Sequence, residues 1–166
     1  MTVAGHADPV MAIFWHSRTG AAQLMAEAMH DAAAGKSRLI AATEASPEDF
    51  LGSAGYAFVC PENLGSMTGM MKEMFDRCYY PALGRIEGRP YVTAIAAGSD
   101  GHGALAQIDR IVTGWRLRRV AEPVIVNLGA QSPEAILAEK KVQKAGLDTC
   151  RDLGAAMAEG LRLGIF

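Results

Sequence analysis

The stretch His16-Ser17-Arg18-Thr19-Gly20 separates two segments with contrasting patterns. The apolar run Val10–Trp15 before it is typical of a buried strand, and residues 20–33 after it have the periodicity of a helix. The start of a helix carries unpaired N–H groups and a partial positive charge. With the hydroxyls of Ser17 and Thr19 and the small Gly20, this turn favours phosphate binding, although an ordinary helix cap uses the same residue types.

Length and composition exclude several classes of protein. A chain of 166 residues predicts one domain, and its 50% apolar content is enough for a full core. A charged fraction of 20% with a net charge of −2 argues against a nucleic-acid-binding surface and against a long disordered region. No apolar run approaches the roughly 20 residues that span a bilayer. We expect a flexible leader at residues 1–9, without the pattern of a signal peptide, followed by a single domain at residues 10–166.

The three cysteines, Cys60, Cys78 and Cys150, are odd in number and far apart in the sequence. They form no C-x-x-C pair and no Cys/His cluster with the spacing of metal ligands. We therefore expect three free, buried thiols, no metal site and a cytoplasmic location, where thiols stay reduced.

Strand and helix patterns alternate along the whole chain. Strands are predicted at residues 10–16, 37–43, 56–60, 91–97 and 123–128. Helices are predicted at 20–33, 46–52, 67–80, 104–115 and 132–163, the last with a break near Gly146. This alternation predicts a parallel sheet covered on both faces, whose ligands bind outside the carboxyl ends of the strands. Three polar, glycine-containing loops, 16–20, 61–66 and 98–103, follow predicted strands and should therefore line one edge.

The predicted helix at 67–80 contains a stripe of sulfur-containing residues. Met67, Met70, Met71, Met74 and Cys78 recur at spacings of three and four, so we expect them to share one face. This face either packs into the core or forms an adaptable wall near a ligand or a subunit interface. The second interpretation, together with the adjacent pair at positions 79 and 80, allows a homo-oligomer.

The sequence leaves the roles of several polar side chains open. His16 and His30 have no evident partner. Glu62 and Asp100 are candidates either for a chemical role or, more simply, for helix caps and solvated charges.

Two segments of the chain resemble the flavodoxin-like family. Residues 17–22, Ser-Arg-Thr-Gly-Ala-Ala, resemble the flavodoxin phosphate loop T/S-x-T-G-x-T but have Ala22 in place of the last hydroxyl. Residues 61–77, PENLGSMTGMMKEMFDR, resemble the pattern P-E-N-F-G-S-M-S-G-x-x-K-x-F-F-D-R of the NAD(P)H-dependent FMN/quinone oxidoreductase branch. Residues 98–101 and the tail Gly164-Ile165-Phe166 are also similar to this family, so the resemblance extends over residues 10–166.

The resemblance implies an α/β three-layer sandwich with a five-stranded parallel sheet in the order 2-1-3-4-5 and FMN at the switch point of that order. By this resemblance, the phosphate would be held by Ser17, Arg18, Thr19, Gly20, Ala21 and Ala22. One side of the flavin ring would be lined by Pro61, Glu62, Asn63, Leu64, Gly65 and Ser66, and the other by Gly98, Ser99, Asp100 and Gly101. The resemblance indicates no catalytic side chain.

The implied function is an FMN enzyme that passes electrons from NAD(P)H to a quinone or another small acceptor. FMN is expected in place of FAD, because no G-x-G-x-x-G turn is present to hold an adenylate half. The alternatives are a one-electron carrier, a flavin-binding module without turnover, and a relative that has lost flavin binding through Ala22.

Two features of the sequence favour the enzyme over the carrier. With 16 basic and 18 acidic residues, the chain lacks the acidic field that steers carriers to large partners. The loops 61–66 and 98–103 contain no Phe, Tyr or Trp to cover the flavin, which leaves a face open to a nicotinamide or a quinone.

Overall fold

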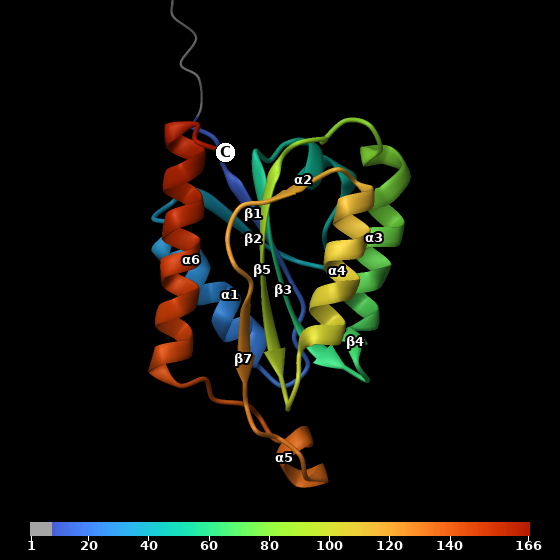
Figure 1. The fold of residues 1–166 in the computed structure, drawn as a ribbon, viewed down its shortest axis with the longest axis vertical. Coiled ribbons are helices and arrows are strands. Elements are labelled where there is room, and N and C mark those ends of the chain that lie inside the picture. The colour runs from blue at the N-terminus through green and yellow to red at the C-terminus, as the bar shows by residue number, and fades with distance from the viewer. Residues whose placement is uncertain (1–7) are drawn as a thin grey trace, which may run out of the picture.

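The computed structural model describes residues 8–166 as one sheet between two helical layers (Figure 1). The central strands are β1 (Met11–Trp15), β2 (Ser37–Ala41), β3 (Gly55–Asn63), β5 (Pro90–Ala97) and β7 (Val124–Asn127). They pair in parallel in the order β2-β1-β3-β5-β7, which confirms the predicted order 2-1-3-4-5. Two short strands add to the predicted five: β4 (Ser66–Met67) pairs antiparallel with β3, and β6 (Arg118–Arg119) pairs in parallel with β5.

The helices divide between the two faces of the sheet. One face is covered by α1 (Ala21–Ala32) and α6 (Lys144–Leu163), and the other by α2 (Pro47–Leu51), α3 (Gly69–Ala82) and α4 (His102–Gly114). The short helix α5 (Pro133–Leu137) lies beyond the carboxyl end of the sheet, at the lower end of the view in Figure 1. Among residues 8–166, none of these helices has the length and hydropathy needed to cross a membrane.

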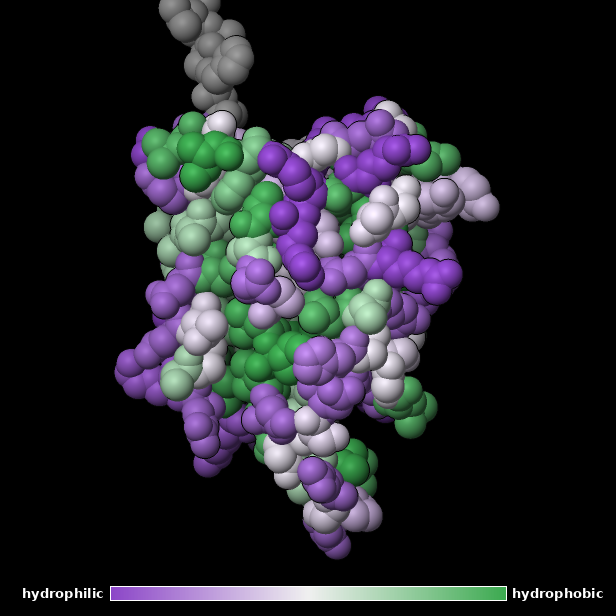
Figure 2. Space-filling model, viewed as in Figure 1, coloured by the Kyte–Doolittle hydropathy of each residue, from purple (hydrophilic) through white to green (hydrophobic). Residues whose placement is uncertain are grey.

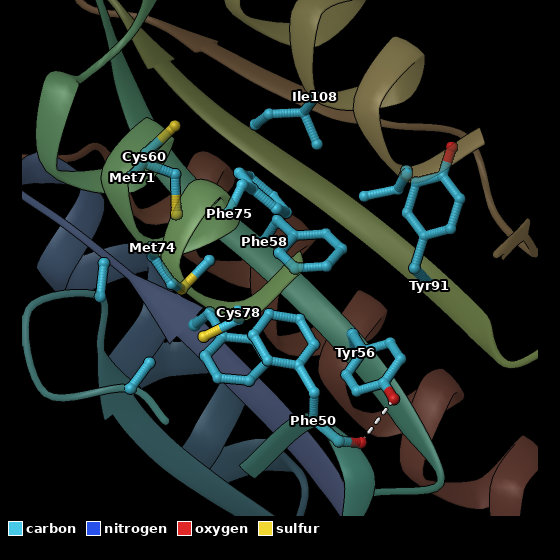
Figure 3. Packing of buried hydrophobic residues seen from close by; sticks show 14 of the residues in the cluster. Phe50, Tyr56, Phe58, Cys60, Met71, Met74, Phe75, Cys78, Tyr91 and Ile108 are labelled. Atoms are coloured by element: carbon cyan, nitrogen blue, oxygen red, sulfur yellow. Dashed lines mark hydrogen bonds between the residues drawn. The ribbon is translucent and has the colours of Figure 1, made fainter. Parts of the chain in front are cut away.

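Side-chain size differs between the two faces of the sheet. On the α3/α4 face, Phe58 and Tyr56 of the sheet lie near Phe75 and Phe50 (Figure 3). The ring of Phe14 stacks on that of Phe50 at 4.2 Å. The Tyr56 hydroxyl is buried there and donates to the Phe50 carbonyl at 2.6 Å. The α1/α6 face is rich in alanine, and α6 approaches α1 so closely that a Cβ on Gly154 would lie 2.5 Å from the Met29 carbonyl oxygen.

Helix α3 begins and ends later than its sequence pattern predicts. Met67 pairs with β3 as part of β4, so the helix begins only after Thr68, and it continues through Pro81 in its last turn. The predicted stripe is buried at Met67, Met71, Met74 and Cys78, but Met70 is 46% exposed and lies off that face. The core interpretation of the stripe is therefore correct for all its members except Met70.

Other predicted boundaries also shift. The break in the last helical stretch lies at residues 138–143 and not near Gly146, which is in the first turn of α6. Helix α4 begins at His102, two residues earlier than predicted, because Gly101 takes the left-handed backbone that caps it. The three cysteines are free and buried, as predicted. Most of the predicted leader, residues 1–7, lies outside the described residues, and Asp8 forms an ion pair with Lys36.

Candidate functional site

The turn between β1 and α1 presents a set of unpaired N–H donors. Gly20 precedes the helix with a φ of 104°, and its N–H donates to the Ser17 hydroxyl at 3.1 Å, which closes the turn. Among residues 8–166, six further N–H groups of this loop and of the first helical turn have no acceptor: those of Ser17, Arg18, Thr19, Ala21, Ala22 and Gln23. Unpaired N–H groups at the start of a helix are the donors that anion sites use in proteins.

His16 connects this turn to the start of α3. Its Nδ1 lies 2.9 Å from the hydroxyl of Thr68, the residue that precedes α3, so the expectation that His16 has no partner is wrong. His30 also has a partner, the Ser37 hydroxyl at 2.7 Å. Burial, and then the charge of Arg18, lowers the pKa of His16, which favours the neutral ring at pH 7. The neutral imidazole thus adds no charge beneath the loop.

The segment predicted as a loop at 61–66 is a β-hairpin. Strand β3 continues through Pro61 to Asn63 and pairs there with β4. Leu64 and Gly65 form the two-residue turn with φ values of 54° and 71°, the backbone of a type I′ turn. Strand β1 pairs with β3 only as far as Val59, so the missing N–H of Pro61 costs little.

Glu62 holds this hairpin against the start of α4. Its Oε1 accepts from the Gly101 N–H at 2.9 Å and its Oε2 from the Ala104 N–H at 3.1 Å. The carboxylate therefore caps the positive end of α4, as one of its two sequence interpretations predicts. The two backbones also touch, since a Cβ on Gly103 would lie 2.0 Å from the Gly65 carbonyl oxygen.

The chain between β7 and α6 adds a third wall that the sequence does not predict. The Asn127 side chain donates to the Ser99 carbonyl at 2.6 Å, and a Cβ on Gly98 would lie 2.8 Å from the Ala130 carbonyl oxygen. Farther along, the Lys140 N–H donates to the Thr19 carbonyl at 2.7 Å. The segment that contains α5 is thus attached both to the 98–99 loop and to the turn that precedes α1.

These walls enclose a cavity of about 850 Å³ at the carboxyl edge of the sheet, within the size range of cofactor sites. The predicted site residues in its wall are Ser17, Arg18, Thr19, Ala21, Ala22, Pro61, Glu62, Asn63, Leu64, Gly65, Gly98 and Ser99. Six further residues line it that the sequence did not indicate: Ala96, Leu128, Ala130, Ile136, Leu137 and Lys140. None of the described residues in this wall is aromatic.

Four predicted site residues lie outside the wall and have structural roles nearby. Gly20 and Gly101 cap α1 and α4 with left-handed backbones, and Ser66 is part of β4. Asp100 lies 2.7 Å from Nδ1 of His102, and both side chains are exposed. In the described part of the chain, no three His, Cys, Asp or Glu side chains are grouped as metal ligands.

The order of the strands, the two helical layers and the cavity at the switch point define a flavodoxin-like α/β fold. No protein-family profile and no curated protein sequence matches the chain.

Solved structures with this fold are similar over nearly the whole chain. A flavodoxin from the domain Archaea aligns with a TM-score of 0.73 and 14% identity over 91% of this chain and 97% of that one. A flavodoxin, WrbA-like protein from Agrobacterium tumefaciens aligns with a TM-score of 0.72 and 19% identity over 93% and 98%. Rubredoxin oxygen:oxidoreductase from Desulfovibrio gigas aligns with a TM-score of 0.74 and 11% identity over 95% of this chain but only 38% of its own.

Proposed function

We propose that this protein binds FMN in the cavity and passes electrons from NAD(P)H to a quinone or another small acceptor. The observation that carries the proposal is the cavity itself, at the point where the strand order reverses between β1 and β3. It joins a turn with free N–H donors to two glycine-containing loops, so one ligand with a phosphate at one end and a flat polar ring at the other would meet all three.

The phosphate end of FMN fits the donors at the turn. The free N–H groups lie at the start of a 12-residue helix, where the helix dipole favours a dianion. Arg18 is exposed and has no carboxylate partner within residues 8–166, so its charge is free to balance the phosphate. Ala22 is 1% exposed, and its methyl packs into the core, which leaves the backbone N–H groups as the donors at that position.

The ring end fits the other walls. Pro61, Ala96 and Leu128 offer apolar surface for a flat ring. Bound FMN would supply the redox chemistry, while the protein binds, orients and partly shields it. The hairpin and α4 are held together by Glu62, so the wall at 61–65 is a rigid support.

The absence of aromatic residues among the described lining residues supports the enzyme over a one-electron carrier. No Phe, Tyr or Trp ring occupies the space beside the proposed ring site, which leaves a stacking position for a nicotinamide and then for the acceptor. We propose hydride transfer from the nicotinamide, with the same position used in turn by the acceptor.

Anaerobic rapid mixing tests the proposal. The FMN-loaded protein is mixed with NADH or with NADPH, the loss of flavin absorption is followed, and a quinone is then added. The proposal predicts complete two-electron bleaching with at least one nicotinamide, and recovery of the colour with quinone. Failure of both nicotinamides, together with a strong paramagnetic signal on photoreduction, would support the carrier instead. Bleaching without recovery by any acceptor would support a flavin-binding module without turnover.

A further inference from the structure

We propose that Lys140 supplies a second positive charge to the phosphate end of the cavity and offsets the hydroxyl that is missing at Ala22. This inference rests on the proposed function, because it assigns a new residue to the same FMN site. Lys140 lies more than 100 residues after the turn in the sequence, and no phosphate-loop pattern includes it.

The backbone places Lys140 directly beside the turn. Its N–H donates to the Thr19 carbonyl at 2.7 Å, and its own carbonyl oxygen lies 3.8 Å from the position of a Cβ on Gly20. Lys140 lines the same cavity as Ser17, Thr19 and Ala22. This contact fixes the residue at the end of the cavity where the free N–H groups lie.

The ammonium group of Lys140 is oriented but not neutralised. It donates to the carbonyls of Ile136 at 2.9 Å and Ala138 at 2.6 Å, which leaves one of its three donors unused. No carboxylate pairs with it within residues 8–166, and the residue is half-buried. A half-buried cation keeps more of its attraction for an anion than a fully solvated one, because water screens it less.

The charge of the ligand explains why such a residue is needed. A phosphate dianion carries up to two negative charges, and Arg18 is the other cation of the cavity wall. The buried methyl of Ala22 removes one side-chain donor from the loop pattern. The Lys140 ammonium, from the segment after β7, would replace this missing donor. Such a role would also explain why the segment is hydrogen-bonded to the turn.

Neighbouring Lys141 provides a matched control. It carries the same charge, is exposed, does not line the cavity and has no ion pair in the described part of the chain. The variants Lys140→Met and Lys141→Met therefore change the net charge equally and differ in distance from the turn. Lys140→Arg keeps the charge and serves as the conservative variant.

The experiment compares FMN with riboflavin, which lacks the phosphate, in fluorescence titrations of all three variants and the natural chain. Lys140→Met should weaken FMN binding about ten- to a hundredfold, the range of one charge-assisted hydrogen bond, and leave riboflavin binding within about twofold. Lys141→Met should leave both affinities within about twofold, and Lys140→Arg should recover most of the FMN affinity. The FMN effect should shrink as salt is added.

Three results would overturn the assignment. Unchanged FMN affinity in Lys140→Met would mean that its ammonium does not contact the phosphate. An equal loss for FMN and riboflavin would mean that Lys140 only caps α5 and shapes the wall. Failure of the natural chain to bind FMN at all would overturn the proposed function itself, a result that the titration of the unmodified protein identifies separately.

Discussion

Gly20 is the residue on which the turn before α1 depends most. Its φ of 104° lies in the left-handed region, and a Cβ would meet nothing closer than 3.8 Å. A side chain at this position is therefore disfavoured by the backbone conformation and not by a steric clash. Thr19 and Ala21 on either side of it line the cavity, and their N–H groups have no acceptor among residues 8–166.

The variant Gly20→Val should change the turn and misdirect its donors. Loss of two charge-assisted hydrogen bonds would weaken FMN binding by about two to four orders of magnitude. Gly35→Val is the control, because Gly35 also has a positive φ, 83°, and open space around it. Unlike the turn before α1, Gly35 lies away from the cavity. Both variants should lose stability in urea denaturation, but only Gly20→Val should lose FMN affinity. An equal affinity in the two variants would mean that the turn is only a helix cap.

The sequence predicts the part of the proposed site that follows β1, β3 and β5 but not the part that follows β7, and the difference has a physical reason. Loops that follow strands of a parallel sheet share one edge, so alternation alone placed Ser17, Gly65 and Ser99 at one cavity. Ile136 and Lys140 could not be placed in this way, because a helix-start signal at residues 132–134 says nothing about where the short helix packs. The only sequence feature that could have indicated this wall is the apolar pair at 136–137, followed closely by two lysines.

Among the helices and strands, the β3–β4 hairpin differs most from the prediction, which placed a loop at residues 61–66. Pro61 suggested the end of a strand, yet β3 continues to Asn63 because its pairing with β1 has already ended. The turn residue Leu64 adopts a φ of 54° and is 98% exposed, although type I′ turns favour Asn or Gly there. Local propensity therefore gave no hairpin signal, and the contacts with α4 determine the structure instead.

The contact between this hairpin and α4 can be tested at Gly103. A Cβ there would lie 2.0 Å from the Gly65 carbonyl oxygen, so Gly103→Ala must separate the two elements. We expect a loss of stability of about 1–3 kcal/mol, as for other overpacking changes, together with weaker FMN binding. Gly114→Ala in the same helix has open space and should be neutral or stabilising by up to about 1 kcal/mol. Urea denaturation of both variants measures this, and a stable Gly103→Ala protein would contradict the contact.

For the molecule as a whole, the buried thiols make the free energy of unfolding fall at alkaline pH. Burial raises the pKa of Cys60 to about 12, and the pKa values of Cys78 and Cys150 to about 11. Above about pH 9 the unfolded chain loses thiol protons that the native protein keeps, so the free energy of unfolding falls as the pH rises.

The variant Cys60→Ala isolates this effect. Its free energy of unfolding should fall less steeply between pH 9 and pH 10 than that of the natural chain, whatever the cost of the substitution at pH 7. Urea denaturation at several pH values gives the two slopes. Identical slopes would show that the Cys60 thiol ionises equally in the native and unfolded states.

Self-association stays a prediction, and fewer residues support it than the sequence pattern indicates. Met67, Met71 and Met74 are buried in the core, so they cannot form a subunit interface. Tyr80 and Leu83, at the end of α3, remain 79% and 52% exposed. Figure 2 also shows hydrophobic surface along β7, at the edge of the sheet.

We expect a homo-oligomer by light scattering, and Tyr80→Glu should shift it toward the monomer. Leu163→Glu, at another exposed apolar residue, should not have this effect. A natural chain that is monomeric at working concentration would contradict the prediction.

Titration with flavins shows whether the cavity at the end of β1 is an FMN site. The purified protein, freed of any bound small molecule, is titrated with FMN and with FAD while visible absorption and flavin fluorescence are recorded. The proposed FMN site predicts one equivalent of FMN bound, with weaker binding of FAD, which would have to place an adenylate half outside the cavity. A protein that remains colourless after incubation with FMN and separation from free flavin would contradict it.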